Sequence, residues 1–261
     1  MKACLCIPSR RPAAEVGPRL VQWLEMGYSV AVAREPEYGP VPCHMMIPTW
    51  RHLGWGGAVD LLALQVLATD SRIDWIVTGG DDGLPDPGTS ADDIAGQLTE
   101  HFKGTFGVMQ PVGDRWGMGE CATCKGAGNI TRVFGMNLMC AHCHGTGKSA
   151  YIDRVAGSPW MGREFCERMY HGGGPIYRGY GHMFDDQELQ TVAEMLGVFQ
   201  QRPDLTHVHE HWARARADQS DMPAWAAQAN SPEQWAYAQK LFETRRAAGF
   251  PGHEPLERYP R

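Results

Sequence analysis

Alternating strand and helix patterns over residues 3–77 most constrain the fold of this 261-residue chain. Residues 3–8, 28–33 and 73–77 are short runs of apolar and β-branched side chains, which are typical of buried strands. Between these runs, apolar residues recur at the spacing of helices that cover a sheet. Strands that alternate with helices over short links predict an α/β fold with a mostly parallel, mixed sheet flanked by helices.

Further elements are predicted along the rest of the chain. They are a small strand over 44–47, a helix that opens at Ser90, a strand over 105–110, a loop entering a short helix over 155–165, a helix with an apolar side that includes Leu189 and Phe199, a strand over 206–212, and a last helix that begins at Ser231 and ends at Gly249.

Composition indicates a soluble globular protein. Hydrophobic residues make up 43% and charged residues 21% of the chain. No apolar run approaches the roughly 18 residues that span a bilayer, and the first residues do not have the pattern of a signal peptide. We therefore expect a cytoplasmic protein with no membrane partner. A formal net charge of −6 gives no whole-molecule reason to expect nucleic acid, so any such contact would be local.

The strand over 73–77 runs into Thr78, two glycines, and then Asp81 and Asp82. Carboxylates at the end of a strand suit Mg²⁺ or Mn²⁺, and the glycines allow a bulky ligand to approach the backbone. The alternative is an acidic turn, because Asp and Gly are also common turn formers.

Two later segments carry side chains suited to chemistry. Asp185 and Asp186 open a helix after a glycine and aromatic loop over 171–181 that suits a substrate flap, although acidic residues often lie there for the cap and the dipole alone. Three histidines then alternate with other residues. If this segment is a strand, they share one face, which favours contact with a metal or a phosphate. They are His207, His209 and His211.

The most specific motif is a pair of Cys-x-x-Cys knuckles. Fifteen residues separate the two pairs, and each pair is followed by glycines that permit tight turns. This spacing predicts a closed structural zinc site with four thiolate ligands, whereas disulfides are disfavoured by the repeated motif. The four ligands are Cys121, Cys124, Cys140 and Cys143.

The repeated Cys-x-x-Cys-x-Gly-x-Gly resembles the zinc-binding repeats of the DnaJ chaperone family over about 27 residues. No J-domain signature accompanies it, so the resemblance implies a small zinc hairpin and not a chaperone. Between Cys121 and Ala150 the cations are Lys125, Arg132 and Lys148, and there is no acidic residue. This mildly positive hairpin could meet a phosphate backbone, or could merely neutralise its own metal site.

The order of these pieces over about residues 3–212 resembles the GT-A fold of nucleotide-sugar glycosyltransferases. The resemblance rests on the first strand ending in Ile7-Pro8-Ser9-Arg10, an acidic residue (Glu35) after the second strand, Asp81-Asp82 at a strand end, Asp185-Asp186 at the start of a later helix, and a downstream histidine. It is nearest to small phage-encoded transferases, some of which modify hydroxymethylated pyrimidines in DNA. The resemblance implies a nucleotide-diphosphate sugar as donor, and Mn²⁺ or Mg²⁺ as the catalytic cation.

The resemblance also implies a role for each residue. Asp82 would hold the cation with His209, for which His207 and His211 are alternates, and Asp81 would contact ribose or sugar. The family motif is Asp-x-Asp, whose first position falls here on Gly80. Pro8, Ser9, Arg10 and Glu35 would face the nucleotide. Asp186, with Asp185 in reserve, would accept the proton of the attacking hydroxyl in an inverting reaction.

This interpretation divides the chain into a donor half (1–116), the zinc hairpin (117–150), an acceptor half (151–212) and a helical extension (213–261).

The leading acceptor is 5-hydroxymethylpyrimidine in DNA, reached through the hairpin, and a protein or a glycan is the alternative. A nucleotidyltransferase also uses paired aspartates at a strand end, and a zinc-hairpin binding module without turnover is a third reading. The sugar, the donor base, the stereochemistry and the oligomeric state stay open.

Overall fold

The core of the structure is a seven-stranded mixed sheet. The computed structural model describes residues 2–51, 53–114, 119–121, 123–131, 137–140, 147–149, 157–210 and 231–253. The strand order is β12-β6-β11-β4-β1-β2-β3. Their bounds are β1 Lys2–Pro8, β2 Ser29–Arg34, β3 Met45–Pro48, β4 Ile73–Val77, β6 Val108–Pro111, β11 Trp160–Gly162 and β12 Phe199–Arg202. Only β11 runs antiparallel to its neighbours in this sheet, so the mostly parallel sheet predicted from the sequence is confirmed.

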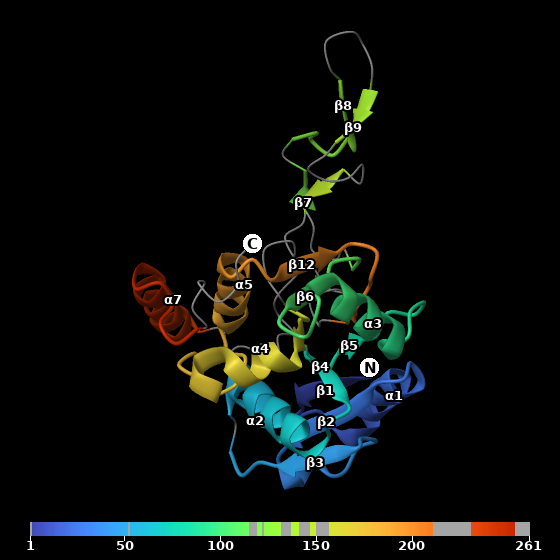
Figure 1. Cartoon of the computed structure of the whole chain (residues 1–261), viewed down its shortest axis with the longest axis vertical. Coiled ribbons are helices and arrows are strands. Elements are labelled where there is room, and N and C mark those ends of the chain that lie inside the picture. Colours follow the sequence, from blue (N-terminus) through green and yellow to red (C-terminus); the bar gives the residue numbers. More distant parts are fainter. Residues whose placement is uncertain are drawn as a thin grey trace.

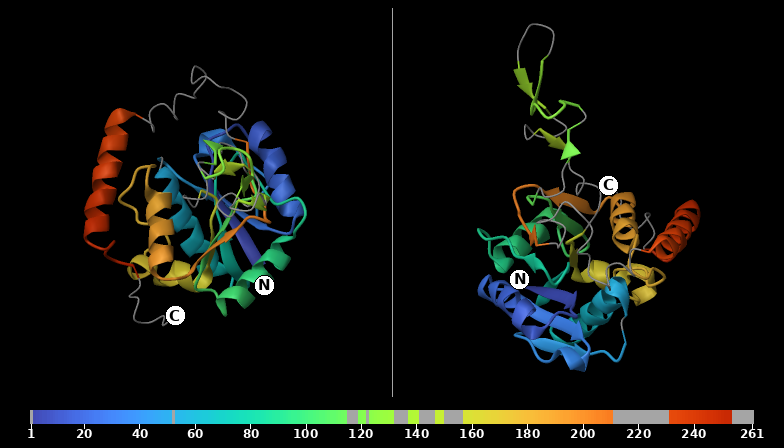
Figure 2. Two further views of the ribbon diagram at one scale, coloured as in Figure 1. Left: turned by 90° about the horizontal axis from the view of Figure 1, so that it is seen from above. Right: turned by 180° about the vertical axis from the view of Figure 1, so that it is seen from behind.

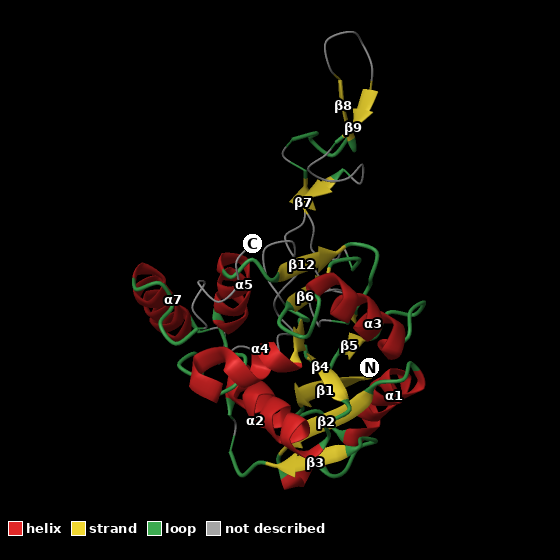
Figure 3. Cartoon of the chain, viewed as in Figure 1, coloured by secondary structure: helices red, strands yellow, loops and turns green. Residues whose placement is uncertain are grey.

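Helices cover both faces of the sheet, as Figures 1 and 3 show. Helices α1 (Ala13–Glu25) and α3 (Ala91–Phe102) lie on one face. The other face carries α2 Gly54–Thr69, α4 Arg163–Arg168, α5 Asp185–Met195 and α7 Pro232–Ala247. Two short 3₁₀ helices are η1 Pro36–Tyr38 and η3 Met169–Gly172. The α/β class predicted from the sequence is therefore confirmed.

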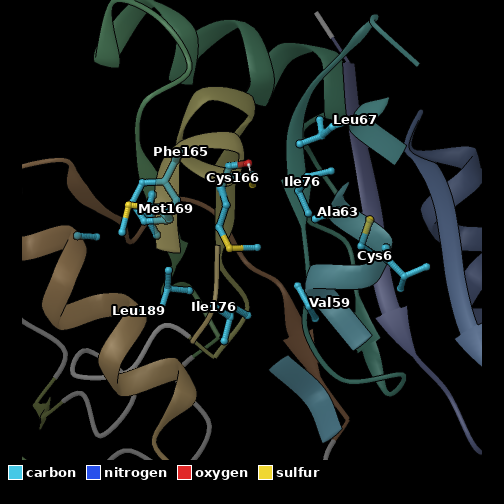
Figure 4. Packing of buried hydrophobic residues seen from close by; sticks show 14 of the residues in the cluster. Cys6, Val59, Ala63, Leu67, Ile76, Phe165, Cys166, Met169, Ile176 and Leu189 are labelled. Atoms are coloured by element: carbon cyan, nitrogen blue, oxygen red, sulfur yellow. Dashed lines mark hydrogen bonds between the residues drawn. The ribbon is translucent and has the colours of Figure 1, made fainter. Parts of the chain in front are cut away.

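The first strand shows why its sequence is apolar throughout. Successive side chains of a strand point to opposite faces. Leu5 and Ile7 pack in the cluster beneath α1 and α3, whereas Cys4 and Cys6 pack in the cluster beneath α2, α4 and α5 (Figure 4). A strand covered on both faces has no position for a solvated side chain, so its sequence is a continuous apolar run.

Two strands lie where the sequence predicts other structure. β11 falls in the predicted loop over 155–165, and β12 begins at Phe199, which the prediction places on a helix. Gly197 has φ of 70°, so α5 ends there and the chain turns into β12. β11 has three residues, too few for alternation to be read. Its Gly162 is needed because a Cβ there would overlap the carbonyl of Thr105.

The cysteine segment leaves the sheet between β6 and β11. β7 (Gly119–Glu120) pairs antiparallel with β10 (Lys148–Ser149), and β8 (Asn129–Thr131) pairs antiparallel with β9 (Asn137–Met139). Figures 1 and 2 show this insertion projecting from the body of the molecule. The strands before and after this insertion in the sequence, β6 and β11, therefore belong to the same sheet.

Two later elements return to the region that follows β4. β13 (Val208–His209) pairs antiparallel with β5 (Gly83–Leu84). It is the part of the strand predicted over 206–212 that is found within 206–210, and residues 211–212 lie outside the described residues. Figure 2 shows α7, the last helix of the chain, lying on the outer side of α5. Among the helices that the structure describes, none combines the length and the apolar character needed to cross a membrane.

Candidate active site

The two aspartates lie between β4 and the short strand β5, which pairs with β13. The β5–β13 pairing places His209 Nε2 3.0 Å from Asp82 Oδ1, and the Glu210 amide donates to the Asp82 carbonyl at 2.8 Å. Burial opposes ionisation of Asp82, but the hydrogen bond from His209 and the charges of His209 and Arg11 lower the pKa of its carboxyl. Asp82 is therefore a buried, ionised carboxylate that already has an imidazole beside it.

The loop after β1 lies against the same carboxylates. Ser9 Oγ donates to Asp81 Oδ2 at 2.8 Å. Arg11 donates through Nε to Asp81 Oδ1 at 2.6 Å and through Nη2 to Asp82 Oδ2 at 2.9 Å. Sequence reasoning selected Arg10 and overlooked Arg11. The available signal was the adjacency of the β1 and β4 carboxyl ends, which brings the whole Ser-Arg-Arg run to the aspartates.

The carboxyl end of β2 adds a second ion pair beside this loop. Arg10 Nε donates to Glu35 Oε2 at 3.0 Å, and the Arg10 guanidinium lies 5.9 Å from the centroid of the Tyr38 ring. Arg34 is buried, and it donates to Ser9 Oγ at 3.3 Å and to the Arg11 carbonyl at 3.0 Å. Arg34, which sequence reasoning missed, therefore ties Ser9 to the Arg11 backbone, while Arg10 and Glu35 form a separate ion pair beside them.

A cavity of about 440 Å³ opens in front of these groups. One wall is polar and comes from the loops after β1 and β4, and the opposite wall combines α7 with the end of the glycine and aromatic loop. The lining consists of 8–11, 79–81, 181–183, Trp55, Gln234 and Ala238. The end of the predicted flap and part of the predicted donor site therefore face one cavity, and α7 forms part of it, whereas Glu35, Asp82 and His209 do not line it.

Asp185 and Asp186 begin α5 just after the cavity-lining segment 181–183 and do not line the cavity themselves. Asp185 is buried beside Gly56, and its Oδ1 accepts the Asp186 amide at 3.0 Å. Burial, and then the charge of Asp186, raise the pKa of Asp185. Burial also raises the pKa of Asp186 to about 6, against the hydrogen bond that its Oδ1 accepts from the Gln187 amide at 2.8 Å.

The three histidines have different environments. His209 meets Asp82, as described above. His207 is buried between the Trp23 and Trp160 rings, with centroid distances of 5.1 and 6.1 Å, and burial lowers its pKa to about 3. Its Nδ1 lies 2.9 Å from Ser158 Oγ. His207 is therefore packed as a neutral core residue, and His211 lies outside the described residues.

The cysteine insertion brings its thiols together. The sulfurs of Cys121, Cys124 and Cys140 all lie within 4.8 Å of one another, and they form no disulfide. The Gly128 amide donates to Cys124 Sγ at 3.2 Å, made possible by a turn in which Gly128 has φ of 74°. Cys143, the fourth ligand predicted from the sequence, lies outside the described residues. Within the described part of the chain this is the one cluster of three or more metal-ligating side chains.

Comparison with known proteins finds likeness in structure only. No family model matches the sequence, and no curated protein matches it. The catalytic domain of Drosophila β1,4-galactosyltransferase 7, complexed with xylobiose, superposes with a TM-score of 0.45 at 13% identity, over 91% of this chain and 79% of that one. A putative glucose-1-phosphate thymidylyltransferase from Bacillus anthracis, complexed with sucrose, gives 0.41 at 9% identity, over 93% and 95%. A UDP-glucose pyrophosphorylase complexed with UDP-glucose gives 0.35 at 11% identity, over 75% and 88%. These values are too low to argue function, so the site has to be interpreted from its own geometry.

Proposed function

We propose that this chain is a metal-dependent glycosyltransferase that moves a sugar from a nucleotide-diphosphate sugar to a hydroxyl group. The observation that carries the proposal is the Asp81–Asp82 pair after the carboxyl end of β4, with His209 beside Asp82 and with Asp81, Arg10 and Arg11 lining one cavity. In α/β sheets, ligands bind outside the carboxyl ends of the strands. Carboxylates can bind a divalent cation, and guanidinium groups can bind phosphate. Because both kinds of group lie side by side here, the site suits a diphosphate that is bound together with a cation.

The residues present fit a divalent cation. Asp82 and His209 offer an oxygen and a nitrogen that lie 3.0 Å apart. Asp81, which is already paired with Arg11, does not form a cluster of three ligand atoms within 4.8 Å together with them. Gly80 leaves room for this arrangement, because a Cβ there would overlap Asp82 Oδ1 and lie 3.4 Å from His209 Nε2. When bound, Mg²⁺ or Mn²⁺ would neutralise negative charge on the departing nucleoside diphosphate.

The chain's own residues would hold the donor along the polar wall. Arg10 and Arg11 would bind its phosphates, and Glu35 with Ser9 would position the nucleotide. Asp81 would contact ribose or sugar. Trp55 presents an indole whose Nε1 is fixed to the Gly79 carbonyl at 3.1 Å, which gives the cavity a rigid planar wall.

Asp186 would act as the general base, with Asp185 in reserve. A carboxylate with a pKa of about 6 is ionised at neutral pH and is more basic than an ordinary aspartate. Its position directly after the cavity-lining residues 181–183 supports this role, which requires the acceptor to enter from the side of α5. An inverting reaction would follow from a base on the face opposite the leaving group.

A nucleotidyltransferase is the second candidate, because the same carboxylates and arginines would also suit a nucleoside triphosphate. The two activities release different products, a nucleoside diphosphate in the first case and pyrophosphate in the second. A binding module without turnover, the third reading, would release neither.

A thermal-shift screen of nucleotide sugars with and without Mn²⁺ tests the proposal. Saturating ligand at about 100 times its dissociation constant stabilises a protein by about 2.7 kcal/mol, so a shift of several degrees is expected for the correct donor. The shift should require the metal and should disappear in Asp82→Asn. No response to any donor would count against the proposal.

We further propose that the cysteine insertion binds structural zinc through the three clustered thiols and Cys143. The closeness of the three sulfurs supports this, because sulfurs that converge within 4.8 Å without forming a disulfide match the arrangement of cysteine ligands around a tetrahedral zinc ion. The expected stoichiometry and its test are given in the Discussion.

For the acceptor we propose 5-hydroxymethylpyrimidine in DNA, presented by the cysteine insertion. Support comes from the cations of the insertion, its lack of acidic residues between Cys121 and Ala150, and its projection from the body (Figure 1). Sugar transfer to hydroxymethylated and unmodified duplexes should be compared. Lys125→Gln should raise the KM for DNA without changing donor binding. The slope of log DNA affinity against log salt concentration should fall by about the amount expected for one lost phosphate contact. Equal transfer to a glycan would contradict the proposal.

A further inference from the structure

Arg11 satisfies the carboxylates that a catalytic cation would need. Its guanidinium bridges Asp81 Oδ1 and Asp82 Oδ2, while Ser9 donates to the other oxygen of Asp81 and His209 lies 3.0 Å from the other oxygen of Asp82. Each of the four carboxylate oxygens therefore has a donor within 3.0 Å. A divalent cation bound to these oxygens would also face a fixed positive charge, and like charges at contact distance exclude one another.

The Arg11 side chain also borders the cavity. Arg11 lines the cavity, and its side chain is about one quarter exposed, at 26%. Its carbonyl is held by Arg34 Nη2 at 3.0 Å, so the backbone is fixed while the side chain can turn. Among the residues that the structure describes, the groups at hydrogen-bonding distance from the guanidinium are the two aspartates, and Arg11 also lines the cavity.

We propose that Arg11 is an exchangeable counter-ion that couples the binding of the cation to the binding of a diphosphate. The guanidinium leaves the aspartates as the divalent cation arrives, and it pairs instead with phosphate oxygens in the cavity. Guanidinium groups bind carboxylate and phosphate with the same two-pronged geometry, so one side chain can serve both positions. This inference rests on the proposed function for the identity of the diphosphate.

Coupling of this kind is reciprocal. If the diphosphate strengthens cation binding by drawing Arg11 away, the cation must strengthen diphosphate binding by the same factor. Without a diphosphate, the cation has to displace Arg11 unaided and binds weakly. Arg11 thereby keeps the two aspartates neutralised until both ligands are present.

The test is Mn²⁺ binding, measured by electron paramagnetic resonance of free Mn²⁺, for wild type, Arg11→Gln and the control Arg10→Gln. Arg10 lines the same cavity but pairs with Glu35 and not with the aspartates, so it controls for loss of an arginine. Each protein is titrated alone and with UDP, GDP, ADP or CDP, and protein-free nucleotide corrects for Mn²⁺ bound in solution. Arg11→Lys and circular dichroism show whether a change reflects folding.

Arg11→Gln should bind Mn²⁺ about tenfold more tightly than wild type without nucleotide, and the strengthening by nucleotide should shrink from about tenfold to nearly none. Arg10→Gln should keep the wild-type affinity for Mn²⁺ alone. Unchanged or weaker Mn²⁺ binding by folded Arg11→Gln, with nucleotide binding intact, would overturn the counter-ion role and leave the proposed function standing. Tighter Mn²⁺ binding with no nucleotide bound by any variant would overturn the exchange together with the proposed function.

Discussion

Gly80 and Asp82 approach so closely that a side chain on Gly80 would occupy the position of Asp82 Oδ1. The same hypothetical Cβ would lie 3.4 Å from His209 Nε2. Gly80 is therefore required by the local geometry. It allows the Asp82 side chain to turn back toward His209.

Gly80→Ala should displace Asp82 from His209 and lower Mn²⁺-dependent activity by about tenfold or more, since each tenfold needs only ~1.4 kcal/mol at the transition state. Overpacking of this kind typically costs about 1–3 kcal/mol of unfolding free energy. Steady-state kinetics and urea unfolding measure the two effects. Gly96→Ala is the control, because nothing lies within 4 Å of a Cβ there. A fully active Gly80→Ala enzyme would contradict this account of the site.

Asp82→Asn and Asp81→Asn should differ. Asp82 faces His209 and is the proposed cation ligand, so its loss should remove several kcal/mol of charge stabilisation and lower kcat about 100-fold or more. Asp81→Asn should mainly raise the KM for the donor, because its proposed contact is to ribose or sugar. Kinetics with varied Mn²⁺ and varied donor separate the two effects. The reverse pattern would assign the cation to Asp81.

The pH dependence of the reaction should report Asp186. Burial raises its pKa to about 6, so kcat/KM should rise with pH through about 6 and then level off. A pH profile of wild type measures this, and Asp186→Asn should lose the rise together with most of the activity. A profile centred near 4 would exclude Asp186 as the base.

Stability provides an independent check on the same carboxyl. A folded pKa above the unfolded value means that the folded state binds the proton more tightly, so ionisation of Asp186 destabilises the fold as pH rises from about 4 to about 6. Asp186→Asn should therefore be more stable than wild type above pH 6, by roughly 1–3 kcal/mol. Below about pH 4 the difference should vanish. Greater stability of wild type at neutral pH would contradict the raised pKa.

A buried ion pair fixes α7 against α5. Arg245 donates to both oxygens of Glu188 at 2.6 and 2.8 Å, and the hydroxyls of Tyr170 and Tyr180 donate to the same carboxylate at 2.8 Å. Glu188→Ala leaves a buried guanidinium without its partner, which typically costs about 3–5 kcal/mol. Because α7 also lines the cavity, the KM for substrates should rise as well.

Urea unfolding checks this prediction. The control is Arg72→Ala, which removes an ion pair whose arginine is 72% exposed; because surface ion pairs contribute little, this variant should unfold close to wild type. Equal loss of stability in both variants would mean that the Glu188 pair does not anchor α7.

The cysteine insertion should hold about one zinc ion per chain. Atomic emission should find that Cys121→Ser and Cys143→Ser both lose this zinc, and that Cys43→Ala, outside the cluster, retains it. Chelation should expose the insertion to protease while the main unfolding transition moves little, because the described part of the insertion projects from the body of the molecule (Figure 1). Full zinc content in Cys143→Ser would exclude a four-cysteine site.

Much of the sheet was predictable because its strands are covered on both faces. β4 spans the residues predicted for it, and Ser90 caps α3 as its motif suggests, with its hydroxyl accepting the Asp93 amide at 3.2 Å. β11 and β12 were not predictable, since the first is three residues long and the second is polar at a sheet edge. Their hydrogen bonding to neighbouring strands, rather than any pattern in their own sequences, makes these segments strands.

For the site, the sequence identified the groups but not their pairing. Asp81, Asp82 and Ser9 were recognised from strand-end positions, because parallel strands end at one edge. That Arg11 and not Arg10 would reach the aspartates depends on the path of one loop. Alternation places His207 and His209 on one face, but only the packing of Trp23 and Trp160 shows that His207 belongs to the core.

The most direct test of the central claim is identification of the phosphorus product by ³¹P NMR. Wild-type protein with Mn²⁺, the donor selected by thermal shift, and a hydroxyl acceptor should release a nucleoside diphosphate in step with glycosylated acceptor, and Asp82→Asn should release almost none. Pyrophosphate formed from a nucleoside triphosphate and a sugar phosphate, with no sugar transfer from any donor, would contradict a glycosyltransferase and establish the nucleotidyltransferase reading.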